Sequence, residues 1–139
     1  MKILRLTAIL ALALILSGCA RIELTNARVE LLPDKTVLTI TLGGRGGPIQ
    51  MLPLEAKLID DLGGEHAAVE YTGDLEDLFG KDRKASVSGT IVFPPLDPET
   101  PRVKIDLVTL VAAKGRRYVS RIAGDVTDGA ADSLTFSRR

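Results

Sequence analysis

Short runs of alternating apolar and polar residues recur along the chain after about residue 20, separated by turn-forming residues. The clearest run spans residues 36–42, where Leu38, Ile40 and Leu42 share one face and threonines alternate with them. Such period-two alternation is typical of a β-strand with one buried face, and no long window shows the helical period. The pattern therefore predicts an all-β domain.

Two strands have further features. In residues 21–31 the apolar parity switches at Thr25-Asn26, which predicts a β-bulge or a change of sheet. Residues 103–111 are the most apolar run, so we expect them in the centre of a sheet. The complete pattern predicts strands at 21–31, 36–42, 52–60, 65–71, 85–93, 103–111 and 117–123, with a further edge strand at 134–137.

The connections carry turn signals of different kinds. Asp60–Gly64 predicts a hairpin turn, and the proline-rich segment 94–101 predicts a stiff link, because proline donates no ladder hydrogen bond. The glycine-rich segment 43–48 lacks the lysine and hydroxyl of a P-loop, so we interpret it as a mobile connection. Gly73–Gly80 predicts one helical turn, capped by Asp74, that plugs one end of the domain. Seven or eight strands with these turns predict an immunoglobulin-like β-sandwich.

The first residues have a different pattern. Lys2 and Arg5 precede residues 6–16, which are apolar except for Thr7. A bilayer-spanning helix needs about 20 apolar residues, and this run is shorter. A charged start followed by a short apolar run is typical of a secretory signal peptide.

The apolar run ends in Leu16-Ser17-Gly18-Cys19, which resembles the lipobox of bacterial lipoproteins. The resemblance implies cleavage between Gly18 and Cys19 and attachment of acyl chains such as palmitate to the Cys19 thiol. Residues 1–18 would then be a removable signal peptide, and 19–139 a single domain tethered to the cell envelope. Ala20, rather than aspartate, follows the cysteine, which favours the outer membrane where the source has two membranes.

Composition limits the remaining interpretations. Removing the first 18 of 139 residues leaves 121, enough for one domain, with a short flexible tail over 126–139 as one interpretation of its end. Without Lys2 and Arg5, 16 basic residues remain against 18 acidic ones, a net charge of about −2, so nucleic acid is not an expected partner. Cys19 is the only cysteine, so the domain has no disulfide.

A second resemblance covers Lys35 to Val111. Leu58–Gly64 forms a Leu-Ile-Asp-Asp-Leu-Gly-Gly hairpin, Ser86–Phe93 has the sequence Ser-Val-Ser-Gly-Thr-Ile-Val-Phe, and a proline-rich link leads into an apolar strand. The stretch is similar to immunoglobulin-like domains of uncharacterised bacterial envelope lipoproteins. The resemblance implies a fold and a location, and it implies no catalytic residues.

No enzyme motif is evident. The only histidine is His66, interpreted as a solvated neighbour of the hairpin turn, and neither a Gly-x-Ser-x-Gly nor a Ser-x-x-Lys sequence occurs. We therefore expect a non-catalytic binding or structural module without a cofactor, held at the membrane by Cys19 and bound to an envelope protein. The alternative is a calcium- or metal-binding protein or an enzyme that uses acidic loops. The acidic clusters are Asp60, Asp61 and Glu65; Asp74, Glu76 and Asp77; and Asp125, Asp128 and Asp132.

Overall fold

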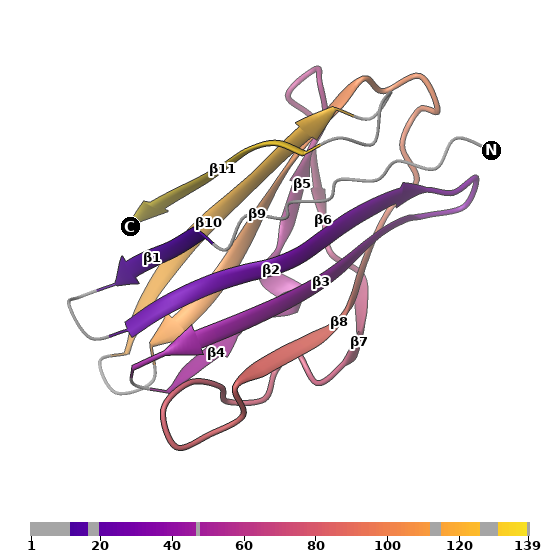
Figure 1. Ribbon diagram of the computed structural model, residues 1–139. Coiled ribbons are helices and arrows are strands. Elements are labelled where there is room, and N and C mark those ends of the chain that lie inside the picture. The colour runs from indigo at the N-terminus through magenta and orange to yellow at the C-terminus, as the bar shows by residue number, and fades with distance from the viewer. Residues whose placement is uncertain (1–11, 17–19, 47, 112–114, 126–130, 139) are drawn as a thin grey trace.

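Two antiparallel β-sheets pack face to face in the computed structural model of the chain (Figure 1). The structure describes residues 12–16, 20–46, 48–111, 115–125 and 131–138. In these residues nearly all regular structure is β, apart from the 3-10 turn η1 (Pro53–Glu55). The predicted all-β sandwich is therefore confirmed.

The first sheet has five strands in the order β1-β2-β3-β8-β7. Their bounds are β1 (Leu12–Leu16), β2 (Ala20–Leu31), β3 (Thr36–Arg45), β8 (Ser86–Phe93) and β7 (Glu70–Gly73). The inward face of β3 carries Leu38, Ile40 and Leu42, all buried as predicted. This sheet supplies one half of the core.

The second sheet has six strands, with the order β11-β10-β9-β5-β6 and a further short strand, β4, paired with β9. Their bounds are β11 (Ala131–Arg138), β10 (Arg116–Asp125), β9 (Arg102–Val111), β5 (Lys57–Ile59), β6 (Glu65–Ala67) and β4 (Ile49–Met51). β9 pairs with β10 on one side and with β4 and β5 on the other, so the prediction that the most apolar strand is central is confirmed.

The bulge predicted in the first strand is present in β2. The register with β3 shifts between Leu24 and Asn26, where β2 advances by two residues while β3 advances by one. Because of this extra residue, Ile22 and Leu24 before the shift and Ala27 and Val29 after it all reach the same core. The inward residues are even-numbered before the bulge and odd-numbered after it, and together they form one continuous buried apolar face.

The prediction of one strand over 52–60 was wrong. The segment holds η1 and β5, and β4 ends just before it at Met51. Pro53 cannot donate a ladder hydrogen bond, so the chain leaves β9 there and rejoins it at Lys57. Leu54 is half exposed on this turn, while Leu58 in β5 is buried.

The predicted strand over 65–71 divides between the two sheets. β6 pairs with β5 in one sheet and β7 pairs with β8 in the other. The crossing is held by two backbone bonds, from Ala68 N to Ala56 O at 3.1 Å and from Val69 N to Val92 O at 2.8 Å. The inward parity changes at the crossing, because His66 and Ala68 are partly buried before it and Tyr71 after it, with Val69 and Glu70 both exposed between them.

The connection between β7 and β8 is not helical, contrary to the prediction, but it does plug one end. Leu75 and Phe79 are fully buried in it. Phe79 exchanges backbone hydrogen bonds with Ile49, at 2.8 and 2.9 Å. β3 extends through Gly43 and Gly44 to Arg45, so the glycine segment is partly strand rather than loop. Gly44 is required by close approach, because a Cβ there would lie 2.8 Å from the Phe79 ring.

The two ends of the chain pair with the sheet edges. β1, from the predicted signal segment, pairs with the first residues of β2, so that Leu16 lies opposite Ala20. β11 pairs with β10 as the expected last edge strand, within the region for which a tail was the other interpretation. Removal of residues 1–18 remains a prediction, and residues 17–19, 126–130 and 139 lie outside the described residues.

Candidate functional site

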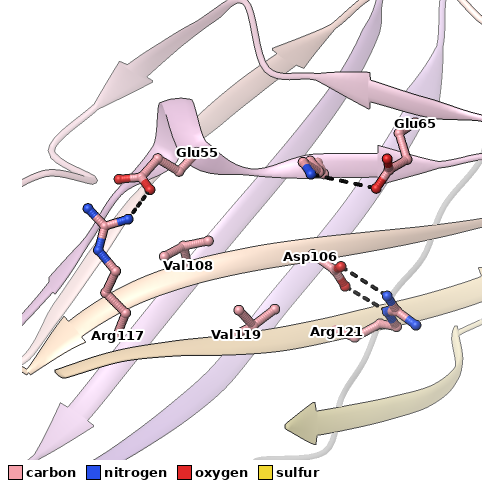
Figure 2. A pocket seen from close by; sticks show the side chains of 8 residues that line it. Glu55, Glu65, Asp106, Val108, Arg117, Val119 and Arg121 are labelled. Carbon is pink, nitrogen blue, oxygen red and sulfur yellow. Dashed lines mark hydrogen bonds and ion pairs between the residues drawn. The ribbon is translucent and has the colours of Figure 1, made fainter. Parts of the chain in front are cut away.

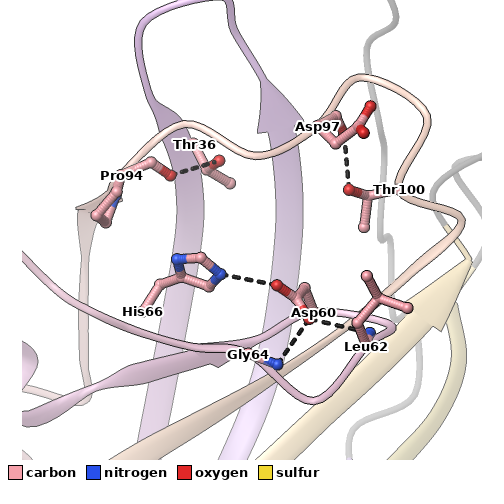
Figure 3. Close-up of polar contacts among 8 residues, drawn as sticks. All are labelled: Thr36, Asp60, Leu62, Gly64, His66, Pro94, Asp97 and Thr100. Atoms are coloured by element: carbon pink, nitrogen blue, oxygen red, sulfur yellow. Dashed lines mark hydrogen bonds and ion pairs between the residues drawn. The ribbon is translucent and has the colours of Figure 1, made fainter.

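Asp60 organises the hairpin between β5 and β6. Its carboxylate accepts hydrogen bonds from the backbone N–H of Leu62 at 3.0 Å and of Gly64 at 2.7 Å, and from Nε2 of His66 at 2.9 Å (Figure 3). The hydrogen bond from His66, followed by that from the Gly64 amide, lowers the pKa of Asp60. Gly63 adopts a left-handed φ of 82°, which glycine takes without strain. The Asp60 oxygens therefore hold the turn in place.

His66 is not the solvated turn neighbour that the sequence suggested. Its side chain is only 26% exposed and is directed at Asp60 (Figure 3). The sequence signal was the spacing of Asp60 and His66 across a tight hairpin, which brings the two side chains to the same end of the β5–β6 pair.

An open hollow of about 330 Å³ lies between this hairpin and the proline-rich link from β8 to β9. The link is fixed by hydrogen bonds from Thr36 Oγ1 to Pro94 O at 3.1 Å and from Thr100 Oγ1 to Asp97 O at 2.6 Å (Figure 3). The lining, with four carboxylates and no lysine or arginine, comprises Asp60, Asp61, Leu62, His66, Pro95, Leu96, Asp97, Glu99 and Thr100.

The apolar part of this hollow includes an unusual surface residue. Leu62, at the hairpin tip, is 91% exposed, the most exposed of the three large apolar side chains that the described surface presents. Leu96 is partly buried against the core and lines the same hollow. Exposed leucine beside carboxylates is a combination suited to a partner with apolar and basic groups. We name this end of the sandwich, formed by the hairpin at 60–64 and the link at 94–101, the hairpin end.

Two members of the second acidic cluster, Asp74 and Asp77, share one lysine within the fold. Asp74 accepts from the backbone N–H of Ser88 at 2.8 Å and from Nζ of Lys84 at 2.9 Å, and Lys84 also pairs with Asp77 at 2.8 Å. The Ser88 amide, and then Lys84, lower the pKa of Asp74, while Asp77 and then Asp74 raise the pKa of Lys84. These carboxylates hold the β7–β8 connection against the start of β8.

The side chains of the third cluster lie outside the described part of the structure. Asp125 ends β10 and Asp132 lies in β11, while Asp128 lies outside the described residues. Across the described part of the chain, no group of three or more histidine, cysteine, aspartate or glutamate side chains is placed to hold a metal ion. The first two sequence clusters therefore form no such group, and the calcium alternative stays a prediction.

The outer face of the second sheet carries a shallow depression of about 320 Å³ whose charges pair with one another (Figure 2). Arg121 donates to both oxygens of Asp106, at 2.6 and 2.9 Å, which raises the pKa of Arg121. Arg117 pairs with Glu55, and Lys57 lies 3.6 Å from Glu65. Because three cations meet three carboxylates, this face offers no net charge to a ligand.

The predicted lipidation and cleavage residues, Cys19 and Gly18, lie outside the described residues. The structure does place the next residue, because Ala20 begins β2. Among the described residues, the structure contains no helix with the length and apolar character needed to cross a bilayer.

The hollow at the hairpin end was not expected from the sequence. Its two walls come from segments far apart in the chain, and only the pairing of β5 with β9 brings them together. Comparison with known proteins adds no assignment, since no family model, no curated protein and no solved structure matches the chain.

Proposed function

We propose that the chain is a lipid-anchored module of the bacterial cell envelope that binds a partner and catalyses no reaction. The observation that supports this best is the sequence Leu16-Ser17-Gly18-Cys19, placed directly before the first residue of β2. In this proposal the Cys19 thiol carries the lipid, residues 1–18 are removed, and the sandwich is held at the membrane, with the outer membrane favoured.

We also propose that the sandwich is immunoglobulin-like. The orders β2-β3-β8-β7 and β10-β9-β5-β6 follow the A-B-E-D and G-F-C-C′ arrangement of immunoglobulin-type sheets. Domains of this architecture commonly bind partners through the loops at one end of the sandwich.

The partner surface in this proposal is the hairpin end, with the hollow between the β5–β6 hairpin and the β8–β9 link. Its support is the combination of exposed Leu62 with four carboxylates in one concave surface. A basic partner with an apolar anchor, such as an envelope protein, fits that chemistry.

Metabolic labelling with palmitate tests the anchor. The wild-type protein should incorporate the label, and Cys19→Ser should lose it. Ser17→Ala is the matched control, because alanine is also small and should leave processing intact. Incorporation into Cys19→Ser, or no incorporation into the wild type, would refute the lipid anchor.

Site-specific photocrosslinking tests the partner surface. A photoreactive residue at position 62 should capture one envelope protein in intact cells. The same residue at position 69 is the control, since Val69 is also exposed, at 60%, and does not line the hollow. Equal capture from both positions, or none from position 62, would rule out the hairpin end as the binding surface.

A further inference from the structure

The first residues of β2 have a partner strand that the proposed processing removes. β1 pairs antiparallel with residues 20–24, from Leu16 opposite Ala20 to Leu12 opposite Leu24, and forms the edge of the first sheet (Figure 1). All five residues of β1 are apolar, and all belong to the proposed signal peptide. In the processed protein β2 is then the edge strand. We name the outer edge of residues 20–24 the edge slot.

The backbone groups that β1 satisfies follow from the neighbouring strands. Gly44 donates its N–H to the carbonyl oxygen of the residue that precedes β8, at 3.3 Å, so its backbone groups face β8. Successive residues of a strand direct their backbone groups to opposite edges, so Gly43 faces β2 and bonds with Glu23, which lies opposite it. By the same alternation, Ile22 and Leu24 direct their backbone groups away from β3 and toward β1. Removal of β1 leaves these N–H and C=O groups without the strand that pairs with them.

The edge slot is short and has defined limits. It begins at Ala20, next to the residue proposed to carry the lipid, and it ends at the bulge after Leu24, where the register of β2 shifts. Its five residues include neither proline nor lysine, which commonly protect an edge strand from pairing with another chain. The processed protein therefore presents an edge of five residues that is open to strand addition.

The side chains beside the edge slot determine which strand fits it. Ile22 and Leu24 are each 1% exposed, belong to the core, and line a small, mostly apolar gap between the two sheets. Residues directly opposite one another in an antiparallel pair lie on the same face, so the residues that an occupant places opposite these two face the core as well. Glu23, between them, is partly exposed and lies 3.5 Å from Arg45, so the residue opposite it faces a polar surface. The slot therefore fits an extended segment with apolar residues at alternate positions.

We propose that the edge slot of the processed protein binds an extended apolar segment of another envelope protein as an antiparallel strand, an inference that rests on the proposed removal of residues 1–18. β1 shows the chemistry that the slot accepts, since Leu-Ala-Leu-Ile-Leu pairs there. Main-chain hydrogen bonds to Ile22 and Leu24 provide the affinity, and the core-facing positions select apolar residues. The slot is separate from the hairpin end, whose hollow has no lining residue in β2.

Binding of a synthetic peptide to the processed lipoprotein tests the edge slot. The peptide has the sequence of residues 11–17, a lysine tail for solubility and a fluorophore, whose anisotropy reports binding to protein purified from membranes in detergent. The processed wild type should bind it. Cys19→Ser removes the cysteine of the cleavage site, so residues 1–18 stay attached and β1 competes from within the chain at an effective concentration of about 1 mM. The apparent affinity of this variant should be weaker by about tenfold or more.

Two methylated peptides separate strand pairing from general adhesion to an apolar surface. N-methylation at the positions of Leu12 and Leu14 removes the N–H groups that face β2, and should weaken binding by about tenfold or more. N-methylation at the positions of Ala13 and Ile15 removes N–H groups directed to the other edge, and should leave the affinity nearly unchanged. The two peptides have the same side chains, number of methyl groups and net charge.

Amide hydrogen exchange locates the peptide and identifies a competing occupant. The N–H groups of Ile22 and Leu24 should exchange slowly in Cys19→Ser, rapidly in the processed wild type, and slowly again when the unmethylated peptide is added. Protection without peptide that rises with protein concentration would show that a second copy fills the slot. Protection without peptide that is independent of concentration would show that the chain closes its own edge. Either result overturns the proposal.

The inference and the proposed function fail in different ways. A wild-type protein whose mass includes residues 1–18 refutes the proposed processing, and the inference with it. A processed protein that does not bind the peptide, or that binds both methylated peptides equally, overturns the inference alone. Equal binding by the processed wild type and Cys19→Ser does the same.

Discussion

Truncation of Phe79 should lower the free energy of unfolding more than most other substitutions, although Phe79 lies in a connection without regular structure. Its ring is fully buried and lies against Gly44 and Ile49. Its backbone N–H and C=O both bond to Ile49, so the connection cannot easily move inward to fill a void. Phe79→Ala should therefore leave a cavity between β3 and β4.

The expected cost is that of a large-to-small core substitution, about 3–5 kcal/mol, from lost burial and the residual cavity. This is a large part of the roughly 5–15 kcal/mol that stabilises a typical domain. With a denaturant slope of about 1.5 kcal/mol/M, the urea midpoint should fall by about 2–3 M. Far-UV circular dichroism of the purified protein measures it, since the chain contains no tryptophan.

A second substitution tests whether the cavity is where the structure places it. In the wild type, Gly44→Ala should destabilise by about 1–3 kcal/mol, because its Cβ would lie 2.8 Å from the Phe79 ring. In the Phe79→Ala background the added methyl group enters the void, so the same change should cost at least about 1 kcal/mol less.

Two results would refute this reasoning about Phe79. One is a loss below about 1 kcal/mol for Phe79→Ala, and the other is simple additivity with Gly44→Ala. Leu62→Ala is the control for loss of an apolar side chain, because Leu62 is exposed and should change stability by less than about 0.5 kcal/mol.

Three further predictions concern other parts of the sandwich. Gly89→Ala places a Cβ 2.0 Å from the carbonyl oxygen of Thr72, so β7 should separate from β8 and lose amide hydrogen-exchange protection; unchanged protection would contradict the close approach of these two strands. Thr109 buries a hydroxyl without a partner in the described structure, so Thr109→Val should raise the free energy of unfolding by about 1 kcal/mol, and a measured decrease would count against it. The lowered pKa of Asp60 stabilises the fold above the ordinary carboxyl pKa, and this contribution is lost as pH falls through the folded value. In Asp60→Asn the urea midpoint should therefore fall less steeply than in the wild type as the pH is lowered. An unchanged pH dependence of the midpoint would exclude Asp60 as a contributor.

The hairpin was predictable from the sequence because its chemistry is local. Asp60 and Gly63 lie within five residues of one another. The Asp60 carboxylate accepts hydrogen bonds from backbone amides of the turn, and Gly63 supplies its left-handed backbone conformation. The hollow beside it was not predictable, because its other wall is the β8–β9 link. Which loops lie side by side depends on strand pairing between distant segments, and alternation does not encode that pairing.

The sequence by itself determined which residues of the long strands face inward, and it located the bulge at Thr25-Asn26 from the parity switch. It did not determine the sheet to which a short strand belongs, as with residues 65–71, because a run of three or four residues does not specify the strand with which it pairs. Nor did it reveal the hollow lined by four carboxylates. The β5–β6 hairpin and the β8–β9 link carry these carboxylates, and only the pairing of β5 with β9 places the two segments side by side. A pattern along the chain does not state which distant segments pair.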